Sequence, residues 1–358
     1  MISNLTQMLS RKLLSKLERF ERLSSDDGVE LLCSDELSVL GYFANRFLGK
    51  LHSDNLVRTY NIERNINYTN VCISNCSFCA FCRTLGSVDG YVLSDEILFA
   101  KIAETVSLGG RQILLQGGLH PLLSFEWYEG LLRRIKDRFP EVNIHGFSPT
   151  EVVFFSDRFG LSVSEVLLRL REAGLGSLPG GGAEILVDRV RRELSPNKAS
   201  ASRWLEVCRE WHKLGGRGSA TMMFGHIETV EERVEHLLRL RELQDETGGF
   251  TSFIPWTFQP FNTRLAHINK TGVWEYLRLL AVSRLFLDNF ETIQSSWVTQ
   301  GLEIGVLGLS FGANDLGSVM IEENVVAAAG TIHRSNESEF QQTIKNAGYL
   351  PARRNQKH

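Results

Sequence analysis

Four of the six cysteines of this 358-residue chain fall within eleven consecutive positions. Cys72, Cys76 and Cys79 are spaced C-x3-C-x2-C, and Cys82 follows three residues later. Thiolates are soft ligands that suit zinc or an iron–sulfur cluster. Three of them leave one iron of a four-iron cluster without a protein ligand, so that a substrate or cofactor can bind there. The alternatives are free buried cysteines or zinc, since Cys76-x2-Cys79 is also a zinc-type spacing.

The overall composition is that of an ordinary globular protein. Lys and Arg number 39 and Asp and Glu 42, which gives a net charge of −3, and hydrophobic residues make up 43%. This balance excludes a disordered chain and gives no indication of nucleic-acid binding. The cysteines are too few for a disulfide scaffold, and neither a signal peptide nor 18 consecutive apolar residues occur. We therefore expect a cytoplasmic protein without a membrane span.

The elements that position the cysteines alternate between short β-rich runs and helical segments from residue 58 onward. This alternation, without consecutive hairpins, predicts an α/β fold of the (β/α)8 TIM-barrel type, in which chemistry lies on the loops that follow the strands. We expect an N-terminal helical cap over residues 1–54, a barrel over 55–335 and a C-terminal tail over 336–358. The eight expected strands are 59–66, 112–116, 143–147, 175–178, 219–224, 251–256, 292–296 and 306–311.

The cysteine motif resembles that of a known superfamily. Cys72, Cys76, Phe78 and Cys79 form C-x3-C-x-aromatic-C after the first expected strand, which resembles the signature of the radical S-adenosylmethionine enzymes. The resemblance implies that the three cysteines hold a [4Fe-4S] cluster, that S-adenosylmethionine chelates its fourth iron, and that one electron releases a 5′-deoxyadenosyl radical. The superfamily normally has an aromatic residue at the position of Cys82, so the role of Cys82 stays open.

Further blocks resemble one family within that superfamily. RNINYTNVC, QGGLHP, LPGGGAEIL, TMMFGHIET, FIPWTFQP and SWVTQGL are similar to blocks of the cyclic dehypoxanthinyl futalosine synthases of the futalosine route to menaquinone. The alternatives are aminodeoxyfutalosine synthase, the deazaflavin-forming radical enzymes and, in a different class, an iron–sulfur or zinc-binding barrel without radical chemistry.

The resemblance also implies a reaction and its partners. The radical would abstract hydrogen from C4′ of the ribose of dehypoxanthinyl futalosine, a nucleoside-like substrate. The carbon radical would then attack the aromatic ring, and loss of a proton and an electron would restore aromaticity. An external reductant such as flavodoxin or ferredoxin would supply the electron to the cluster. Candidates for the group that accepts the last proton are Glu322, Asp315 and His226.

By the same resemblance, segments after other strands contact S-adenosylmethionine. The Gln116–Gly118 segment stands where the superfamily usually has Gly-Gly-Glu, and a tight turn is the alternative. Ser148 and Glu151 would bind the ribose hydroxyls or the amino group, and a helix N-cap is the alternative. The candidate cofactor residues are Phe78, Gln116, Gly117, Gly118, Ser148, Glu151, Gly225 and Glu228.

The implied substrate carries a carboxylate, so a cation is expected near it. Arg83 and His120 are the candidate cations on strand-end loops. For each charged candidate a surface salt bridge is the alternative, and for Glu184 a place in the first turn of a helix. The candidate substrate residues are Arg83, His120, Glu184, Asn314, Asp315 and Glu322.

Overall fold

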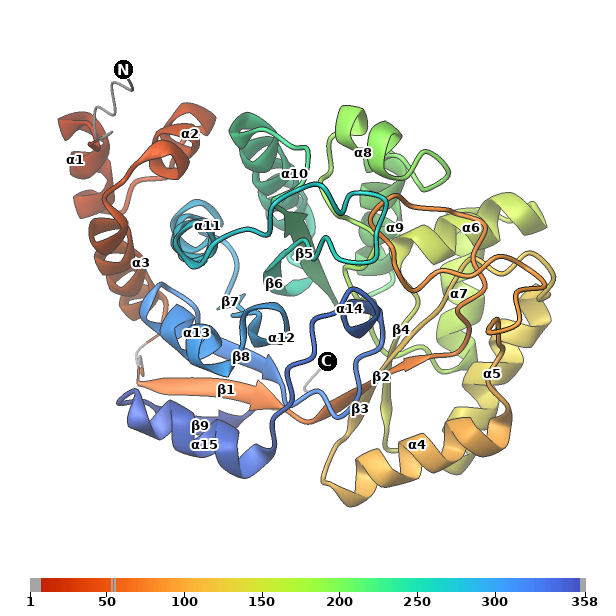
Figure 1. Cartoon of the computed structure of the whole chain (residues 1–358). Helices are drawn as coiled ribbons and strands as arrows, with labels where there is room; N and C mark the ends of the chain where they lie inside the picture. The colour runs from red at the N-terminus through yellow and green to blue at the C-terminus, as the bar shows by residue number, and fades with distance from the viewer. Residues whose placement is uncertain (1–7, 53, 55, 355–358) are drawn as a thin grey trace.

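The computed structural model describes residues 8–52, 54 and 56–354 and has parallel strands surrounded by helices (Figure 1). Its strands form three sheets with the orders β8-β1-β9, β2-β3-β4 and β5-β6-β7, and every strand pair within them is parallel. The strands are β1 (Val57–Asn61), β2 (Glu63–Asn67), β3 (Gln112–Gln116), β4 (Asn143–Gly146), β5 (Gly218–Phe224), β6 (Phe250–Thr257), β7 (Thr292–Ile293), β8 (Asp315–Ser318) and β9 (Leu350–Arg353).

Isolated bridges connect one sheet to the next. Ser177 pairs with His145 at the end of β4, and Leu178 pairs with Gly218 at the start of β5. A further parallel bridge joins Gln294, just after β7, to Asp315 in β8. Strands β1 and β2 follow each other with one residue between them, so they also join the first sheet to the second.

Helices follow most of the strands, as expected for an α/β fold. Most of them begin at a Ser, Thr or Asn whose side chain accepts a backbone N–H, the usual N-cap. After the cap they are α4 (Asp95–Ser107), α5 (Phe125–Arg138), α6 (Pro149–Phe159), α7 (Val163–Ala173), α8 (Asp188–Leu194), α9 (Ala201–Lys213), α10 (Val230–Thr247), α11 (Val273–Phe286), α12 (Trp297–Gln300), α13 (Leu302–Leu307), the 3-10 helix η1 (Gly308–Ser310), α14 (Val325–Ala328) and α15 (Glu337–Asn346).

The structure corrects several strand predictions. The expected strand 306–311 is wrong, because these residues form the end of α13, η1 and Phe311, and the strand comes later, at β8. A short apolar run has no period that separates a strand from a buried helix. Residues 175–178 contribute bridges only, 292–296 shrinks to β7, and 59–66 divides into β1 and β2.

The N-terminal segment is helical, as the sequence predicts, and its helices lie at the edge of the molecule (Figure 1). Helices α2 and α3 pack against α10 and α11. At Gly28 a Cβ atom would lie 3.0 Å from the ring of Phe286, so the absence of a side chain allows α2 to approach α11 closely. Residues 1–7, 53 and 55 of this region lie outside the described residues. The cap consists of α1 (Arg11–Arg19), α2 (Ser25–Cys33) and α3 (Leu37–Leu51).

The C-terminal segment is more ordered than a tail. Helix α15 buries Phe340 and Ile344 in the core, and β9 pairs in parallel with β1. After β9, the guanidinium of Arg354 lies 3.7 Å from Glu63 and 3.5 Å from Asp315. The expected C-terminal tail over 336–358 thus contains a helix and a strand up to residue 354, and residues 355–358 lie outside the described part.

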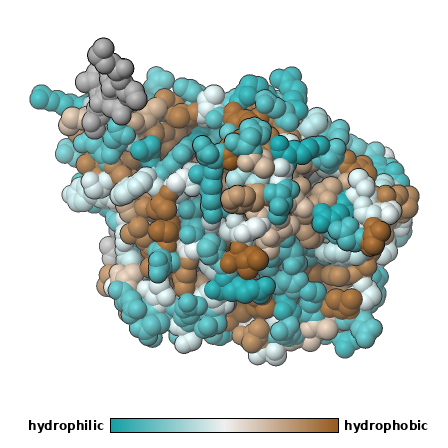
Figure 2. All heavy atoms as spheres, viewed as in Figure 1, coloured by the Kyte–Doolittle hydropathy of each residue, from teal (hydrophilic) through white to brown (hydrophobic). Residues whose placement is uncertain are grey.

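The core has two hydrophobic clusters, one around β5–β8 and one around β2–β4. In the second cluster, Tyr68, Tyr128, Phe147 and Phe155 contact one another with ring centres 4.3–5.9 Å apart. On the face drawn in Figure 2, apolar residues are interspersed with polar ones. Across the described residues, no helix is both long and apolar enough to cross a membrane.

Candidate functional site

The cysteine loop begins directly after β2, at the carboxyl end of the strands. The register pairs Asn67 with Gln116, so β2 and β3 end at the same level. The loop folds back on itself, since Cys72 N donates to Arg83 O at 2.9 Å and Arg83 N donates to Asn70 O at 2.9 Å. Ile73 N also donates to Leu119 O at 3.1 Å, which fixes the loop to the segment after β3.

The thiols of this loop have different surroundings. Cys76 is buried with its Sγ 3.2 Å from Ser74 Oγ, and burial raises the pKa of its thiol. A hydrogen bond from the Cys82 thiol lowers the pKa of Cys72 to about 6, and it raises the pKa of Cys82. Cys82 Sγ also lies 3.3 Å from Cys72 O. Ser74 N donates to Cys72 Sγ at 3.4 Å, so Cys72 has contacts both with the backbone and with Cys82.

The donor set of the loop consists of thiols. Such soft ligands suit an iron–sulfur cluster, in which each thiolate binds a different iron, and they also suit zinc. Cys72, Cys76 and Cys79 are all free thiols. Phe78, between the second and third, packs against the core with its ring 4.9 Å from Lys198 Nζ.

The glycines after β3 are required by the chain itself. A Cβ atom at Gly117 would lie 2.5 Å from the ring of Tyr68, and one at Gly118 would lie 2.2 Å from Val71 O. Gln116 O accepts a hydrogen bond from Asn67 Nδ2 at 3.4 Å. The tight-turn alternative therefore accounts for both glycines.

Ser148 and Glu151 form a capping box at the start of α6. Ser148 Oγ accepts from Glu151 N at 3.3 Å, while Ser148 N and Oγ both donate to Glu151 Oε2 at 2.7 Å. Glu151 Oε1 accepts from Tyr68 Oη at 2.7 Å and from Gly117 N at 3.2 Å. Burial raises the pKa of Glu151. The helix-cap alternative describes what these two residues do here, and Glu151 also joins the ends of β2 and β3 to α6.

Glu228 forms a second buried clamp after β5. It accepts hydrogen bonds from Gly225 N at 2.6 Å, His226 N at 2.9 Å and Arg233 Nε at 2.8 Å. Burial acts to raise the pKa of Glu228, but the hydrogen bonds and charges of His226 and Arg233 hold it well below its usual range. Both ring nitrogens of His226 have close polar neighbours. Its Nδ1 lies 2.7 Å from Ile227 N and 2.8 Å from Glu228 Oε2, and its Nε2 lies 2.9 Å from Met223 O.

Both expected cations have partners within their own loops. Arg83 pairs with Asp89, and its NH1 donates to the carbonyls of residues 80, 81 and 82 at 3.0–3.2 Å. Arg83 therefore holds the backbone at the end of the cysteine loop. His120 is buried and accepts from Leu122 N at 3.2 Å, and burial lowers its pKa, so it stays neutral.

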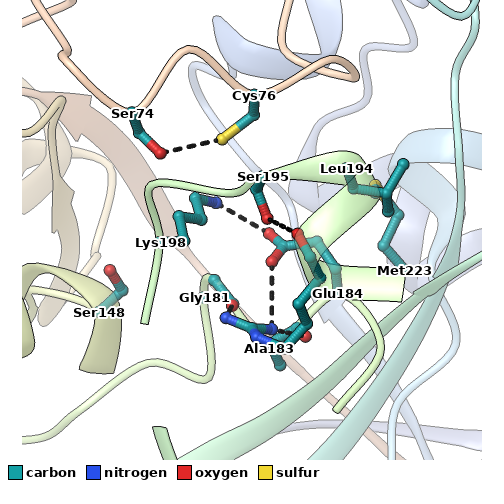
Figure 3. A network of polar contacts seen from close by, with 12 residues as sticks. Ser74, Cys76, Ser148, Gly181, Ala183, Glu184, Leu194, Ser195, Lys198 and Met223 are labelled. Atoms are coloured by element: carbon teal, nitrogen blue, oxygen red, sulfur yellow. Dashed lines mark hydrogen bonds and ion pairs between the residues drawn. The ribbon is translucent and has the colours of Figure 1, made fainter. Parts of the chain in front are cut away.

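Glu184 lies deep behind the cysteine loop (Figure 3). Its Oε1 pairs with Lys198 Nζ at 3.0 Å, and its Oε2 lies 3.6 Å from Arg191 NH1 without a hydrogen bond. Its backbone is left-handed, with φ of 40°, so the first-turn alternative is wrong. Nearby, Thr150 Oγ1 is also buried without a hydrogen-bond partner, facing Gly182. Buried polar atoms without partners fit a site that a polar ligand completes.

The structure separates Glu322 from Asn314 and Asp315. Asp315 pairs in register with Thr59, at the start of the strands, and Asn314 precedes it. Glu322 lies level with Asn65, further toward the carboxyl end, because Asn65 N donates to Glu322 O at 3.1 Å. Asn314 and Asp315 are thus at the opposite end from the cysteine loop, and their placement at the mouth rested on the wrong strand 306–311.

Glu322 lines a cavity of about 450 Å³ beside the cysteine loop. Its carboxylate pairs with Lys101 Nζ at 2.6 Å and accepts from Asn324 Nδ2 at 2.8 Å. Burial acts to raise the pKa of Glu322, but Lys101 and Asn324 lower it overall. Lys101 and Lys198 were missed, because a lone lysine in a helical or loop segment carries no sequence signal. The cavity is lined by Asn67, Phe81, Tyr91, Leu93, Lys101, Glu322, Asn324 and Ala328.

Comparisons with known proteins match nearly the whole chain. Residues 66–240 match the model of the radical SAM superfamily, and residues 247–358 match the CofH/MqnC C-terminal region. The chain is 49% identical to cyclic dehypoxanthine futalosine synthase from Halalkalibacterium halodurans, over 93% of this chain and 90% of that one. Identity is 44% to the same-named enzyme of Streptomyces coelicolor, over 93% and 84% of the two chains. It is 40% to aminodeoxyfutalosine synthase of Thermus thermophilus, over 95% and 92%.

A solved structure supports the fold. Methylornithine synthase (PylB) superposes with a TM-score of 0.73 at 21% identity, covering 95% of this chain and 97% of that chain. At this identity the likeness concerns the fold alone, which is the α/β fold with parallel sheets seen here. Together with relatives that align over nine-tenths of its length, these matches show that the chain is an enzyme and belongs to the radical S-adenosylmethionine superfamily.

Proposed function

We propose that this enzyme converts dehypoxanthinyl futalosine to cyclic dehypoxanthinyl futalosine, in the futalosine route to menaquinone. The single observation that carries the proposal is 49% identity to a cyclic dehypoxanthine futalosine synthase over 93% of the chain. The cysteine loop follows the carboxyl end of β2, and active sites of barrel enzymes lie at this end of the strands. Aminodeoxyfutalosine synthase is the second candidate, with a relative at 40% identity over a similar length.

We propose that the strands close into a (β/α)8 barrel over residues 55–335, with the helices before residue 55 as its cap. The bridges at residues 177, 178 and 294 support closure, because they pair the edge of each sheet with the next. The segment from 336 onward adds α15 and β9 to the start of this barrel.

Cys72, Cys76 and Cys79 are the proposed ligands of a [4Fe-4S] cluster. When bound, this cluster and S-adenosylmethionine supply the radical that abstracts hydrogen from the ribose of the substrate. Cys82 is not a ligand in this proposal, and its thiol lies 3.3 Å from the backbone oxygen of Cys72. Thr150 and Glu184 offer the unpartnered buried oxygens expected beside a polar cofactor.

The cavity beside Glu322 is the proposed substrate site. Its polar side chains lie at the carboxyl end of the strands, and Lys101, which pairs with Glu322, is the cation among its lining residues. The lowered pKa of Glu322 keeps it ionised. Its carboxylate is therefore able to accept the proton that the aromatic ring loses, whereas His226 and Asp315 are committed elsewhere.

An external one-electron carrier of the flavodoxin or ferredoxin class is the proposed reductant. All six cysteines are free thiols, which supports a reducing compartment and hence the cytoplasm as the place of the reaction.

The decisive experiment compares substrates. The anaerobically reconstituted, reduced enzyme is incubated with S-adenosylmethionine and either dehypoxanthinyl futalosine or the chorismate-derived enol ether, and products are followed by mass spectrometry. The proposal expects 5′-deoxyadenosine and the cyclised product only from the first substrate. Turnover of the enol ether alone would establish aminodeoxyfutalosine synthase. A barrel without radical chemistry would give no 5′-deoxyadenosine from either.

A further inference from the structure

A largely buried lysine, Lys198, lies beside the cysteine loop. The side chain of Lys198 is 14% exposed, and its Nζ lies 3.0 Å from Glu184 Oε1 and 4.9 Å from the centre of the Phe78 ring. Phe78 stands between Cys76 and Cys79 in the chain, so the ammonium group lies against the segment that carries two proposed cluster ligands. Figure 3 shows the amino group of Lys198 directed at Glu184, on the side of the network that faces Cys76.

Backbone contacts hold the segment of Lys198 against the loop. Ser77 donates to Leu194 O twice, from its backbone N at 2.8 Å and its Oγ at 3.0 Å. Asn197 Nδ2 donates to Ser74 O at 3.4 Å. The position of the ammonium group relative to the thiols is therefore fixed by the fold rather than by a flexible side chain at the surface.

The charges of Lys198 and Glu184 lie close to the thiols. The Lys198 ammonium lies 4.9 Å from the ring of Phe78, which comes two residues after Cys76 and directly before Cys79. The carboxylate of Glu184, 6% exposed, lies 3.0 Å from that ammonium. Charges act over such distances because largely buried surroundings screen them weakly.

We propose that Lys198 sets the reduction potential of the cluster held by Cys72, Cys76 and Cys79, with Glu184 as a partial counter-charge. The inference rests on the proposed function, since it requires the cluster. Reduction takes one electron from the external carrier and no proton, so the reduced cluster is more negative by one charge. A buried cation stabilises that state, and a buried anion destabilises it. Lys198 is thus a positioning residue that acts through the cluster.

The test is a mediated redox titration of the anaerobically reconstituted full-length enzyme, followed by electron paramagnetic resonance without S-adenosylmethionine. Lys198→Met should lower the equilibrium constant for reduction about tenfold, which for a one-electron couple is about 59 mV toward more negative potential. Glu184→Gln should move the potential in the opposite direction. Lys198→Arg keeps the charge and should stay near the wild-type value. Lys213→Met is the matched control, since Lys213 is 59% exposed and ends α9.

The outcomes separate this inference from the function on which it rests. A Lys198→Met enzyme that holds the cluster with an unchanged potential, or that shifts like Glu184→Gln, would overturn the role of Lys198. If Lys198→Met fails to hold the cluster, the sign of the Glu184→Gln shift decides, and a negative or absent shift overturns the proposal. A wild-type enzyme that takes up no four-iron cluster would instead contradict the proposed function.

Discussion

The two ends of the strands use buried polar side chains differently. At the start of the strands, Glu63 accepts from Gln112 Nε2 at 2.7 Å, and Asp315 accepts from Thr59 Oγ1 at 2.6 Å. Arg354 lies within 3.7 Å of both carboxylates. Charge and hydrogen bonding at this end are supplied by the chain itself, so these residues stabilise the fold.

At the carboxyl end the chain leaves groups unused. Thr150 Oγ1 and Glu184 Oε2 are buried without hydrogen-bond partners, and the loop thiols are free. A buried polar group without a partner costs free energy, and a protein retains it where a ligand supplies the missing contact. The contrast teaches that buried polar atoms without partners at the carboxyl end are strong candidates for contacts with a ligand.

Cys76→Ala is expected to have the largest effect. Loss of one thiolate from a three-thiolate set should abolish the brown iron–sulfur chromophore and the cleavage of S-adenosylmethionine. Absorption spectra and iron content of the reconstituted protein measure this. Cys82→Ala should leave the cluster largely intact. The ligand set is wrong if Cys82→Ala destroys the cluster while Cys72→Ala does not.

Arg354→Met should destabilise the fold without reducing turnover per folded molecule. It leaves the carboxylates of Glu63 and Asp315 without their cation, at a cost of roughly 1–3 kcal/mol in the free energy of unfolding. Urea unfolding measures the loss. The neighbouring Arg353 is half exposed and pairs with Glu337 at the surface, so Arg353→Met should cost less than about 1 kcal/mol. Equal losses of unfolding free energy in the two variants would contradict the view that Arg354 stabilises the buried carboxylates at the start of the strands.

Glu228→Gln tests a polar group that the fold satisfies near the site. The pKa of Glu228 is lower in the folded enzyme than its usual 4.5. Its charge therefore stabilises the fold fully above that value, and the contribution is lost as the pH falls below it toward the folded pKa. Melting temperatures of the wild type and the variant should differ most at pH 6–7 and converge in acid. A difference in melting temperature that grows in acid would show that the folded pKa of Glu228 is raised instead of lowered.

Tyr68→Phe should have the smallest effect, about 1 kcal/mol in the free energy of unfolding. It removes the 2.7 Å hydrogen bond to Glu151 and leaves the ring packing intact. Tyr128 provides the control, because its ring contacts the same cluster while its hydroxyl is buried without a partner. Chemical unfolding should show Tyr128→Phe as neutral or stabilising. A larger loss for Tyr128→Phe would show that packing, not the hydrogen bond, dominates.

Local patterns predicted local features well. The expected strand 112–116 matches β3 residue for residue, and the helical cap forms as its spacing indicates. The error at 306–311 arose because a short apolar run fits a buried helix as well as a strand. That error moved Asn314 and Asp315 to the wrong end of the molecule. The partners of Arg83 and His120, at Asp89 and Leu122, depend on loop conformations that the sequence alone does not specify.

The sequence by itself determined the superfamily, the loop of three thiols and the class of chemistry, because these depend on residue types at short spacing. Only the tertiary structure decided which polar residues remain available. Glu151 caps α6, and Glu228 accepts hydrogen bonds from Arg233 and the loop backbone. Lys101 and Lys198 lie near the cysteine loop although they are distant from the cysteines in the sequence. Hydrogen bonds and charges act through space, so their partners are fixed by folding rather than by sequence neighbourhood.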